Sequence, residues 1–373
     1  MSDKNIKAMI ANTFLEVADA LETGQYGKKP VIGFASEGSE HGQDNIDLAM
    51  KLAAGNGVKA VLLEGEDLHK KMESMLDSGE IDAAVTMHYP FPIGVSTVGK
   101  TITPGMGKPM YIATTTGTSD TDRISAMVKN TIYGIIAAKA DGVKNPTVGI
   151  ANIDGARQTE KALLQLVENG YEINFADSAR ADGGVAMRGN DLLAGTPDIM
   201  VMDSLTGNLM MKIFSAFTTG GNYESVGFGY GPGIGEGFER LILIVSRASG
   251  APVIAKAMEY ATNLVRNDWK KIAAEEFAKA NKAGLQNILN ELKASKKDSG
   301  AAAEKEVKMP PKEVVTAQIP GIEVMDLEDA VKVLWAAGIY AESGMGCTGP
   351  IVLMSDANKA KAQELLKEAG YIS

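Results

Sequence analysis

The sequence predicts an α/β protein with parallel sheets, followed by a small C-terminal module of two helices and two strands. Three observations support this prediction. Short apolar runs alternate with polar turns and helical patterns, which is typical of a parallel α/β sheet. Glycine is frequent, with 41 residues in a chain of 373, as expected for many tight turns between strands and helices. A polar stretch near residue 300 separates the last part of the chain from the rest.

The first half of the chain begins with an amphipathic helix over residues 3–23, in which apolar residues recur at helical spacing. A strand of the buried type, residues 30–35, then runs into the polar turn 36–42. The further elements that we expect in this half are helix 43–55, strands 60–63, 81–87 and 109–114, and helix 120–142 with Ser119 or Asp120 as its cap.

The second half repeats the strand–helix pattern and adds a long glycine-rich loop over residues 219–237. We read this loop as flexible or as lining a substrate site. The elements that we expect are strand 147–152, helix 156–169, strands 173–176, 199–204 and 241–245, and a last pair of helices over 252–293.

Composition divides the chain into three parts. Residues 1–293 form the core, residues 294–315 form a flexible linker that is too polar to pack, and residues 316–373 form a cysteine-bearing module. The module has an α-β-β-α order. Its expected elements are helix 326–337, strands 339–342 and 350–354, and helix 356–369, with Cys347 at the tip of the hairpin.

Charge and composition exclude several classes of function. The formal net charge of −10, from 37 basic and 47 acidic residues, argues against a nucleic-acid partner, as does the aromatic content of 6%. No apolar run approaches the ~20 residues of a membrane span, so we expect no membrane partner. A single cysteine and the absence of a signal-type N-terminus indicate a reducing cytoplasm. With three histidines and no metal-ligand spacing, we expect no metal site.

The segment from Asp203 to Lys212 is the best candidate for an anion site. A strand end meets a glycine turn and a helix that we expect to carry Lys212 in its first turn. Backbone N–H groups point outward at such a junction, and the lysine adds a positive charge. An ordinary tight turn with a solvated lysine explains the local pattern equally well. The candidate residues are Asp203, Ser204, Thr206, Gly207, Asn208 and Lys212.

Ser246 and Arg247 follow the apolar strand 241–245 and form a second candidate. The arginine fork matches phosphate oxygens, and sites of α/β proteins collect at the carboxyl ends of strands. The alternative is a salt bridge at the rim of the sheet. The glycines of residues 229–237 superficially suggest a dinucleotide loop, but they precede a strand instead of following one, so we expect no NAD site there.

Other polar residues at strand ends could line the same cleft. Ser36, Ser39 and His41 follow the first strand, and His88 follows a later one. A lone histidine near a strand end is usually structural or solvated, so these four residues carry little functional weight.

The lone cysteine, Cys347, lies in the glycine-rich loop 344–350. It cannot form an internal disulfide. A thiolate in such a loop could be reached by a ligand and surrounded by backbone N–H groups. The alternative is an inert loop cysteine, because thiol reactivity depends on pKa and exposure.

Together these stretches resemble a known family over essentially the whole chain, namely the alpha subunits of component C of the glycine/sarcosine/betaine reductase complex. That family is itself similar to the phosphate acyltransferases of phospholipid synthesis and to phosphotransacetylases. The resemblance implies a two-lobed, isocitrate dehydrogenase-like core with the site between the lobes. The segments that support it are residues 96–119, 173–195, 202–224, 227–250 and 325–352.

The resemblance also implies roles for individual residues. The run from Asp203 to Lys212 looks like a run of the acyltransferases, and Gly207, Asn208 and Lys212 match the phosphotransacetylases as well. Ser246-Arg247 aligns with the catalytic Ser-Arg pair of phosphotransacetylases, although residues 244–245 are Ile-Val where that family has Asn-Asp.

The implied activity is acyl transfer to phosphate. An acetyl thioester on Cys347 would react with inorganic phosphate to give acetyl phosphate, without a cofactor. Arg247, Lys212 and the helix start 207–212 would hold phosphate, and Ser246 would bind the carbonyl or a phosphate oxygen. The implied partners are the component C beta subunit and the selenoprotein component A, which carries the carboxymethyl group, in a hetero-oligomer.

Two other functions stay open. A stand-alone phosphate acyltransferase or phosphotransacetylase, using acyl carrier protein or coenzyme A, would not need the cysteine tail. A non-catalytic scaffold subunit would leave the chemistry to a partner. A flexible linker of about 20 polar residues spans roughly 25 Å, so the Cys347 module either moves between a loading site and the phosphate cleft or stays docked.

Overall fold

The computed structural model describes residues 29–179, 183–302, 307–322, 326–346 and 349–372, together with positions 7, 10, 11, 13, 14, 17, 18 and 21. Most of the helix expected over residues 3–23 lies outside these residues, and the described positions within it are helical. In the described part of the chain, no helix is long and apolar enough to cross a membrane.

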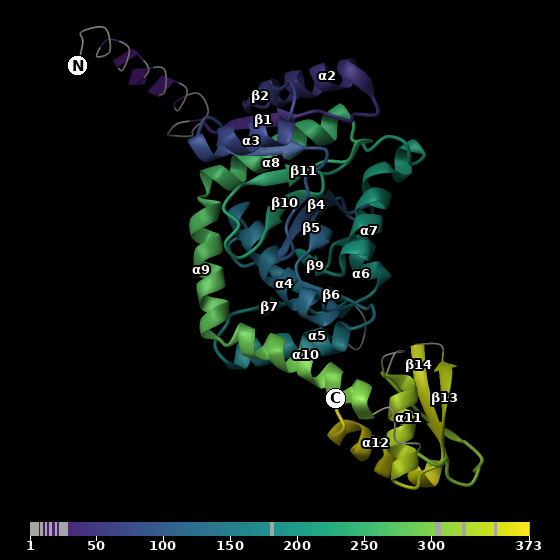
Figure 1. Cartoon of the computed structure of the whole chain (residues 1–373). Helices are drawn as coiled ribbons and strands as arrows, with labels where there is room; N and C mark the ends of the chain where they lie inside the picture. The colour runs from purple at the N-terminus through teal and green to yellow at the C-terminus, as the bar shows by residue number, and fades with distance from the viewer. Residues whose placement is uncertain are drawn as a thin grey trace.

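One large sheet of eleven strands forms the centre of the core, and most neighbouring strands run parallel (Figure 1). The order is β2-β1-β3-β11-β10-β4-β5-β9-β6-β7, and β8 pairs with β6. In the middle, β10 pairs antiparallel with β11 and β4, and β4 pairs antiparallel with β5, so antiparallel strands join two parallel halves. The strands are β1 (Val31–Ala35), β2 (Lys59–Leu63), β3 (Ala83–Thr86), β4 (Val95–Ile102), β5 (Pro109–Thr118), β6 (Thr147–Ala151), β7 (Asn174–Phe175), β8 (Ala186–Met187), β9 (Ile199–Val201), β10 (Gly231–Ile234) and β11 (Ile242–Ile244).

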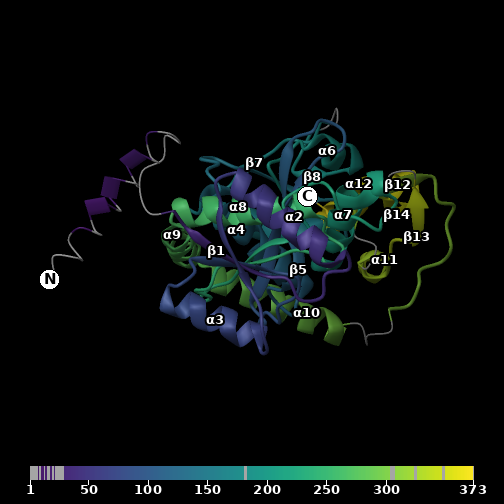
Figure 2. The same cartoon turned by 90° about the horizontal axis from the view of Figure 1, so that it is seen from above.

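Helices cover both faces of this sheet, so that β1, β3, β9, β10 and β11 are buried along their whole length. In β1, Ile32 and Phe34 join the core under α2 and α8, whereas Val31 and Ala35 join the core under α3. Figure 2 shows α3 on one side of β1 and the helices α2 and α8 on the other. The helices of the core are α2 (Gly42–Gly55), α3 (Leu68–Ser78), α4 (Arg123–Ala140), α5 (Ala156–Glu168), α6 (Gly189–Ala194), α7 (Ser204–Ala216), α8 (Ala251–Arg266), α9 (Trp269–Lys282) and α10 (Leu285–Ala302), with the 3-10 turn η1 (Phe217–Thr219).

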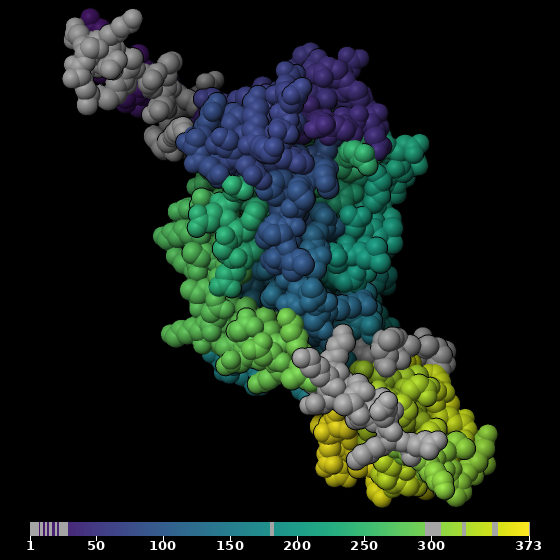
Figure 3. Space-filling view, viewed as in Figure 1, coloured from purple at the N-terminus to yellow at the C-terminus, as the bar shows by residue number. Residues whose placement is uncertain are grey.

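The C-terminal module has its own antiparallel sheet, ordered β12-β14-β13, and its own apolar core. It forms a separate lobe beside the core in the space-filling view (Figure 3). A hydrogen bond of 2.8 Å from the Gln158 side chain of α5 to the Asp326 carboxylate connects the two parts. The elements are β12 (Ala317–Pro320), α11 (Leu327–Ala336), β13 (Ala341–Gly346), β14 (Gly349–Met354), η2 (Asp356–Asn358) and α12 (Lys359–Glu368).

The middle of the sheet differs most from the sequence prediction. Strand β4 was not expected, because buried Ser96, Thr97 and Thr101 give it a polar appearance. Ser96 and Thr97 are satisfied by hydrogen bonds to other side chains. Part of the expected glycine loop is the buried strand β10. A Cβ at Gly231 would lie 1.7 Å from the Val98 carbonyl oxygen, so glycine allows β10 to pack closely against β4.

Three other features also differ from the sequence prediction. The last helices of the core are three instead of a pair, and α10 continues to Ala302, into the segment expected as a linker. The module contains β12 before its first helix, in addition to the expected α-β-β-α elements. The cap of α4 is Asp122, which accepts a hydrogen bond from the backbone of Ser125, and not Ser119 or Asp120.

Candidate functional site

Asp203 occupies the start of α7, where we expected an anion to bind. Its carboxylate accepts hydrogen bonds of 3.0 Å from the backbone N–H groups of Leu205 and Thr206, and one of 2.7 Å from the Thr206 hydroxyl. Arg123 adds a further bond of 3.0 Å. Burial raises the pKa of Asp203, but the Thr206 hydrogen bonds and the Arg123 charge outweigh this effect, so the pKa lies below its usual value. The helix N-terminus therefore has its anion already.

The helix begins earlier than the sequence pattern indicated. Residues 206–208 belong to α7 and are not a turn before it, and Lys212 is the ninth helical residue instead of a first-turn residue. Gly207 packs on β5, since a Cβ there would lie 1.8 Å from the Thr114 carbonyl oxygen. Asn208 donates a hydrogen bond of 3.0 Å to the Thr115 carbonyl. Asn208 and Lys212 thus share one face of the helix, as residues four apart do.

Asn208, Lys212 and Ser246 meet at one cavity of about 390 Å³. Ser246 comes from the carboxyl end of β11, and Asn208 and Lys212 come from α7. The cavity opens at the carboxyl ends of β3 and β11, where sites of parallel sheets are usual. The other lining residues are Met87, His88, Tyr89, Thr116, Tyr230, Ile244 and Val245.

Behind this cavity lies Glu224, a residue that the sequence analysis did not single out. Its side chain is fully buried, and its Oε1 lies 3.2 Å from the Nζ of Lys212. Lys212 itself is 36% exposed. The hydroxyl of Tyr230 donates a bond of 2.9 Å to the same carboxylate. Burial and the Glu224 charge raise the pKa of Tyr230 far above its ordinary value, so this hydroxyl stays protonated as a donor.

The segment that presents Ser246 is held from two sides. The backbone N–H of Ser246 donates a bond of 3.0 Å to the Ser249 hydroxyl, and the Ser246 hydroxyl accepts one of 3.1 Å from Ala248. From α2, the Asn45 side chain donates to the Ser249 carbonyl at 3.2 Å. His41 lies 3.0 Å from the Ala248 carbonyl oxygen. His41 therefore contacts this segment and does not line the Lys212 cavity.

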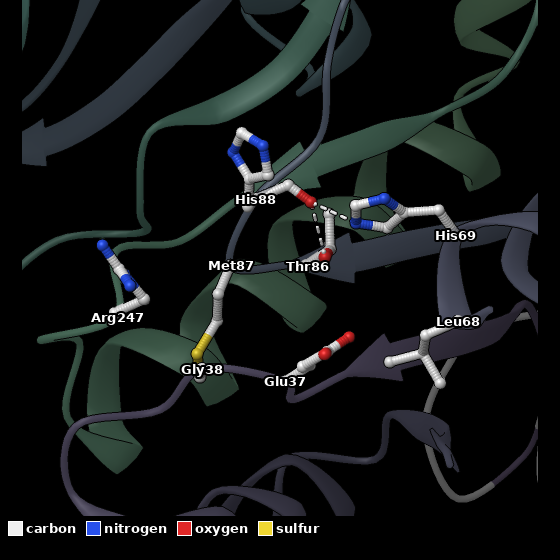
Figure 4. Close-up of a pocket in the computed structure, with 8 residues that line it drawn as sticks. All are labelled: Glu37, Gly38, Leu68, His69, Thr86, Met87, His88 and Arg247. Carbon is white, nitrogen blue, oxygen red and sulfur yellow. Dashed lines mark hydrogen bonds between the residues drawn. The ribbon is translucent and has the colours of Figure 1, made fainter. Parts of the chain in front are cut away.

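Arg247 lines a neighbouring cavity of about 590 Å³, and not the one that holds Lys212 (Figure 4). In this view Arg247 and His69 stand at opposite ends of the cavity, and Glu37 lies between them. His69 donates a hydrogen bond of 2.8 Å to the His88 carbonyl. Met87 and His88 line both cavities, so the two adjoin each other across these residues.

Asp203, Ser204 and Thr206 line a third cavity, of about 350 Å³, together with Arg123. The structure therefore divides the predicted phosphate site. Asn208, Lys212 and Ser246 come together, Arg247 lies next to them, and the helix start points elsewhere. The reason is that α7 begins at Ser204, which places its first turn and its third turn on different cavities.

Cys347 and Thr348, between β13 and β14, lie outside the described residues. Among the residues that the structure describes, no three His, Cys, Asp or Glu side chains gather in a way that could hold a metal ion.

Comparisons with known proteins show to which family the chain is related. A family model described as fatty acid synthesis protein matches residues 18–353. The glycine/sarcosine/betaine reductase complex component C subunit alpha of Peptoclostridium acidaminophilum is 58% identical over the full length of both chains. The phosphate acyltransferase of Caldicellulosiruptor saccharolyticus is 33% identical over 88 residues, which are 22% of this chain and 24% of that protein. That of Thermosipho africanus is 32% identical over 92 residues, which are 24% and 26%. The chain therefore belongs to the fatty acid synthesis protein family and is related over its full length to the alpha subunit of reductase component C.

Proposed function

We propose that this chain is the alpha subunit of component C of a glycine, sarcosine or betaine reductase complex, and that it transfers an acetyl group from a Cys347 thioester to inorganic phosphate. The observation that supports this most is the meeting of Lys212, Asn208 and Ser246 at one cavity. The full-length relative at 58% identity has the name of that subunit. Its partners would be the beta subunit and the selenoprotein component A.

The cavity offers groups suited to an anion that attacks a carbonyl. The ammonium of Lys212 would hold phosphate, and the hydroxyl of Ser246 would donate to the thioester carbonyl or to a phosphate oxygen. A phosphate oxygen attacks the carbonyl carbon and forms the new C–O bond. The C–S bond then breaks, and the sulfur of Cys347 leaves with the electron pair as a thiolate. Positive charge on Lys212 stabilises the oxyanion that develops in between.

Arg247 is suited to an electrostatic role beside the site of this reaction. Its guanidinium lines the adjoining cavity, across Met87 and His88 from Lys212. From there it would attract phosphate toward the site against the net charge of −10. We assign it this electrostatic role, with direct phosphate contact assigned to Lys212.

The experiment that tests the proposed function is mass spectrometry of the chain after incubation with acetyl phosphate. We expect one acetyl group on Cys347, removed again by added phosphate or arsenate. Cys347→Ala should lack both the adduct and the arsenate-dependent breakdown of acetyl phosphate, while its melting temperature stays unchanged. Absence of an adduct in the unaltered chain, with the beta subunit present, would overturn the proposal.

A second candidate function is a stand-alone phosphate acyltransferase, favoured by the segments shared with two phosphate acyltransferases. Such an enzyme would take its acyl group from acyl carrier protein or coenzyme A, and Cys347 would have no role. Cys347→Ala distinguishes the two candidates, because it would spare the second activity and abolish the first.

A further inference from the structure

Glu224 is a fully buried acidic residue that contacts two residues of the Lys212 cavity, Lys212 and Tyr230. Its side chain has no exposed surface, and each of its carboxylate oxygens has a partner. Oε1 accepts from the Nζ of Lys212 at 3.2 Å and from the hydroxyl of Tyr230 at 2.9 Å. Oε2 accepts from the hydroxyl of Ser249 at 2.7 Å. A buried carboxylate is costly unless it is paired and hydrogen-bonded in this way.

The two carboxylate oxygens of Glu224 bond to two different segments that line the cavity, one directly and one through Ser249. Through Oε1, Glu224 fixes the ammonium of Lys212 on α7. Through Oε2, it fixes the Ser249 hydroxyl, which in turn accepts the backbone N–H of Ser246 at 3.0 Å. One carboxylate therefore connects the Lys212 ammonium with the backbone of Ser246, two residues that line the same cavity, although they lie in separate segments of the chain.

The backbone of Glu224 is held equally firmly. Its N–H donates to the Ala248 carbonyl at 3.0 Å, and its carbonyl accepts from the Gly250 N–H at 2.8 Å. Residues 224 and 249 form a parallel bridge. The backbone of Glu224 is thus fixed to the segment that carries Ser246, while its side chain contacts Lys212.

We propose that Glu224 is a positioning residue, which sets the separation between the Lys212 ammonium and the Ser246 hydroxyl across the cavity. This inference rests on the proposed function, because it assigns those two groups to phosphate and to the thioester. Glu224 lies behind both groups and touches neither ligand. Its effect on the reaction is therefore on geometry in the transition state, where a displacement of about 1 Å can cost up to roughly a hundredfold in rate.

The chemistry of this position requires a carboxylate. The three hydrogen bonds to the Glu224 carboxylate come from the donors Lys212, Tyr230 and Ser249, and a carboxylate accepts at both oxygens. A glutamine of the same shape has one oxygen and one NH₂ group. If that NH₂ faces Lys212 and Tyr230, these two donors lose their acceptor. If it faces Ser249, the Ser249 hydroxyl has to accept where it donated before. In both cases the negative charge beside Lys212 is lost.

The test uses Glu224→Gln with a matched control elsewhere in the chain. Glu276, on α9, is 3% exposed and accepts from Lys139 and Lys279 at 2.9 Å and from Tyr171 at 3.0 Å. Like Glu224, it is therefore a buried carboxylate with lysine and tyrosine donors. We expect both Glu→Gln variants to lose melting temperature to a comparable degree. For Glu224→Gln alone, we expect kcat for acetyl phosphate formation to fall by about tenfold or more, with the KM of phosphate changed less than about threefold.

Two further measurements separate positioning from loss of structure. Glu224→Asp keeps both acceptor oxygens, so it should recover part of the lost kcat. In a double-mutant cycle, Ser249→Ala should have a smaller effect on kcat in the Glu224→Gln background than in the unaltered chain, because both changes break the same connection. Additive effects of the two changes would overturn the connection through Ser249.

The outcomes distinguish the inference from the function on which it rests. If the unaltered chain with its beta subunit forms no acetyl phosphate, both are overturned. If it is active and Glu224→Gln has the same kcat as Glu276→Gln, only the positioning role is overturned. A rise in the KM of phosphate that accounts for the whole loss would also contradict it, since binding and not geometry would then have changed.

Discussion

The Nη2 of Arg123 lies 3.0 Å from the Oδ2 of Asp203, although the two residues are 80 positions apart in the chain. Arg123 is the first residue of α4 and Asp203 is the cap of α7, so this pair brings the starts of two helices together. The guanidinium also reaches Asp154 at 3.3 Å. The Asp203 carboxylate thus accepts from the first N–H groups of α7 and from Arg123, and both residues line the third cavity instead of the Lys212 cavity.

Asp203→Ala is expected to destabilise the protein by about 1–2 kcal/mol, because α7 loses its cap and Arg123 loses a partner. Urea unfolding measures this loss. Glu259→Ala, which removes a surface pair with Lys256, is the control and should cost about 0.5 kcal/mol or less. If Asp203→Ala instead left stability unchanged and raised the KM of phosphate, the phosphate site would lie at the helix start after all.

Lys212→Met is expected to raise the KM of phosphate by about tenfold or more, because the cavity loses its ammonium group. The change also leaves Glu224 buried without its cation, so the melting temperature should fall. Lys256→Met provides a control, since Lys256 pairs with an acid on the surface and does not line the cavity. An unchanged KM in Lys212→Met would remove this residue from the phosphate site.

Gly207→Ala is expected to destabilise the protein by about 1–3 kcal/mol, because the new methyl group would meet the Thr114 carbonyl and push α7 away from β5. Gly55→Ala is the matched helical control, as nothing lies within 4 Å of a Cβ there. It should be neutral or stabilising by up to about 1 kcal/mol. Equal stability of the two variants in urea would mean that α7 does not pack against β5 as described.

Acid should weaken the protein partly through Asp120. Burial raises the pKa of this carboxyl, but the hydrogen bonds from Lys129 and Lys293 outweigh this effect and lower the pKa to about 2. Its folded pKa lies below the unfolded value, so its stabilisation is present above pH ~4 and is lost as the pH falls toward 2. The loss should reach about 2 kcal/mol at most.

The measurement is urea unfolding at a series of pH values between 5 and about 2, with Asp120→Asn beside the unaltered chain. The free energy of unfolding should fall less steeply with pH in the variant, since its amide does not titrate. Parallel slopes for the two proteins would show that Asp120 does not contribute to the acid sensitivity.

Much of the fold could be predicted from local patterns. Strand β6 and helix α5 lie within one or two residues of their expected positions, because apolar periodicity and a terminal glycine define such elements locally. Strands β4 and β10 could not be predicted in this way. Their polar or glycine-rich sequences form strands only because neighbouring strands and α4 supply hydrogen bonds and close backbone contacts.

In the candidate site, too, some residues could be predicted from local patterns and others could not. Ser246 could be identified because it follows β11, and the carboxyl ends of parallel strands share one edge of a sheet. Lys212 was expected in the first turn of a helix, whereas the structure places it in the third turn of α7. Glu224 could not, since its sequence neighbourhood is a glycine-rich loop with no pattern. Only the bridge to Ser249 and the contacts with Lys212 and Tyr230 give it a place behind the cavity.

The sequence by itself determined the α/β class and the resemblance to component C alpha subunits, because both depend on residue types in chain order. The tertiary structure decided which of residues 203–212 face the cavity and which acid holds Lys212 there. The physical reason is that a helix start is set by its cap, here Asp203, and a buried carboxylate by partners from distant segments. The cap lies beside its partners in the chain, whereas the partners of Glu224 cannot be read from its neighbouring residues.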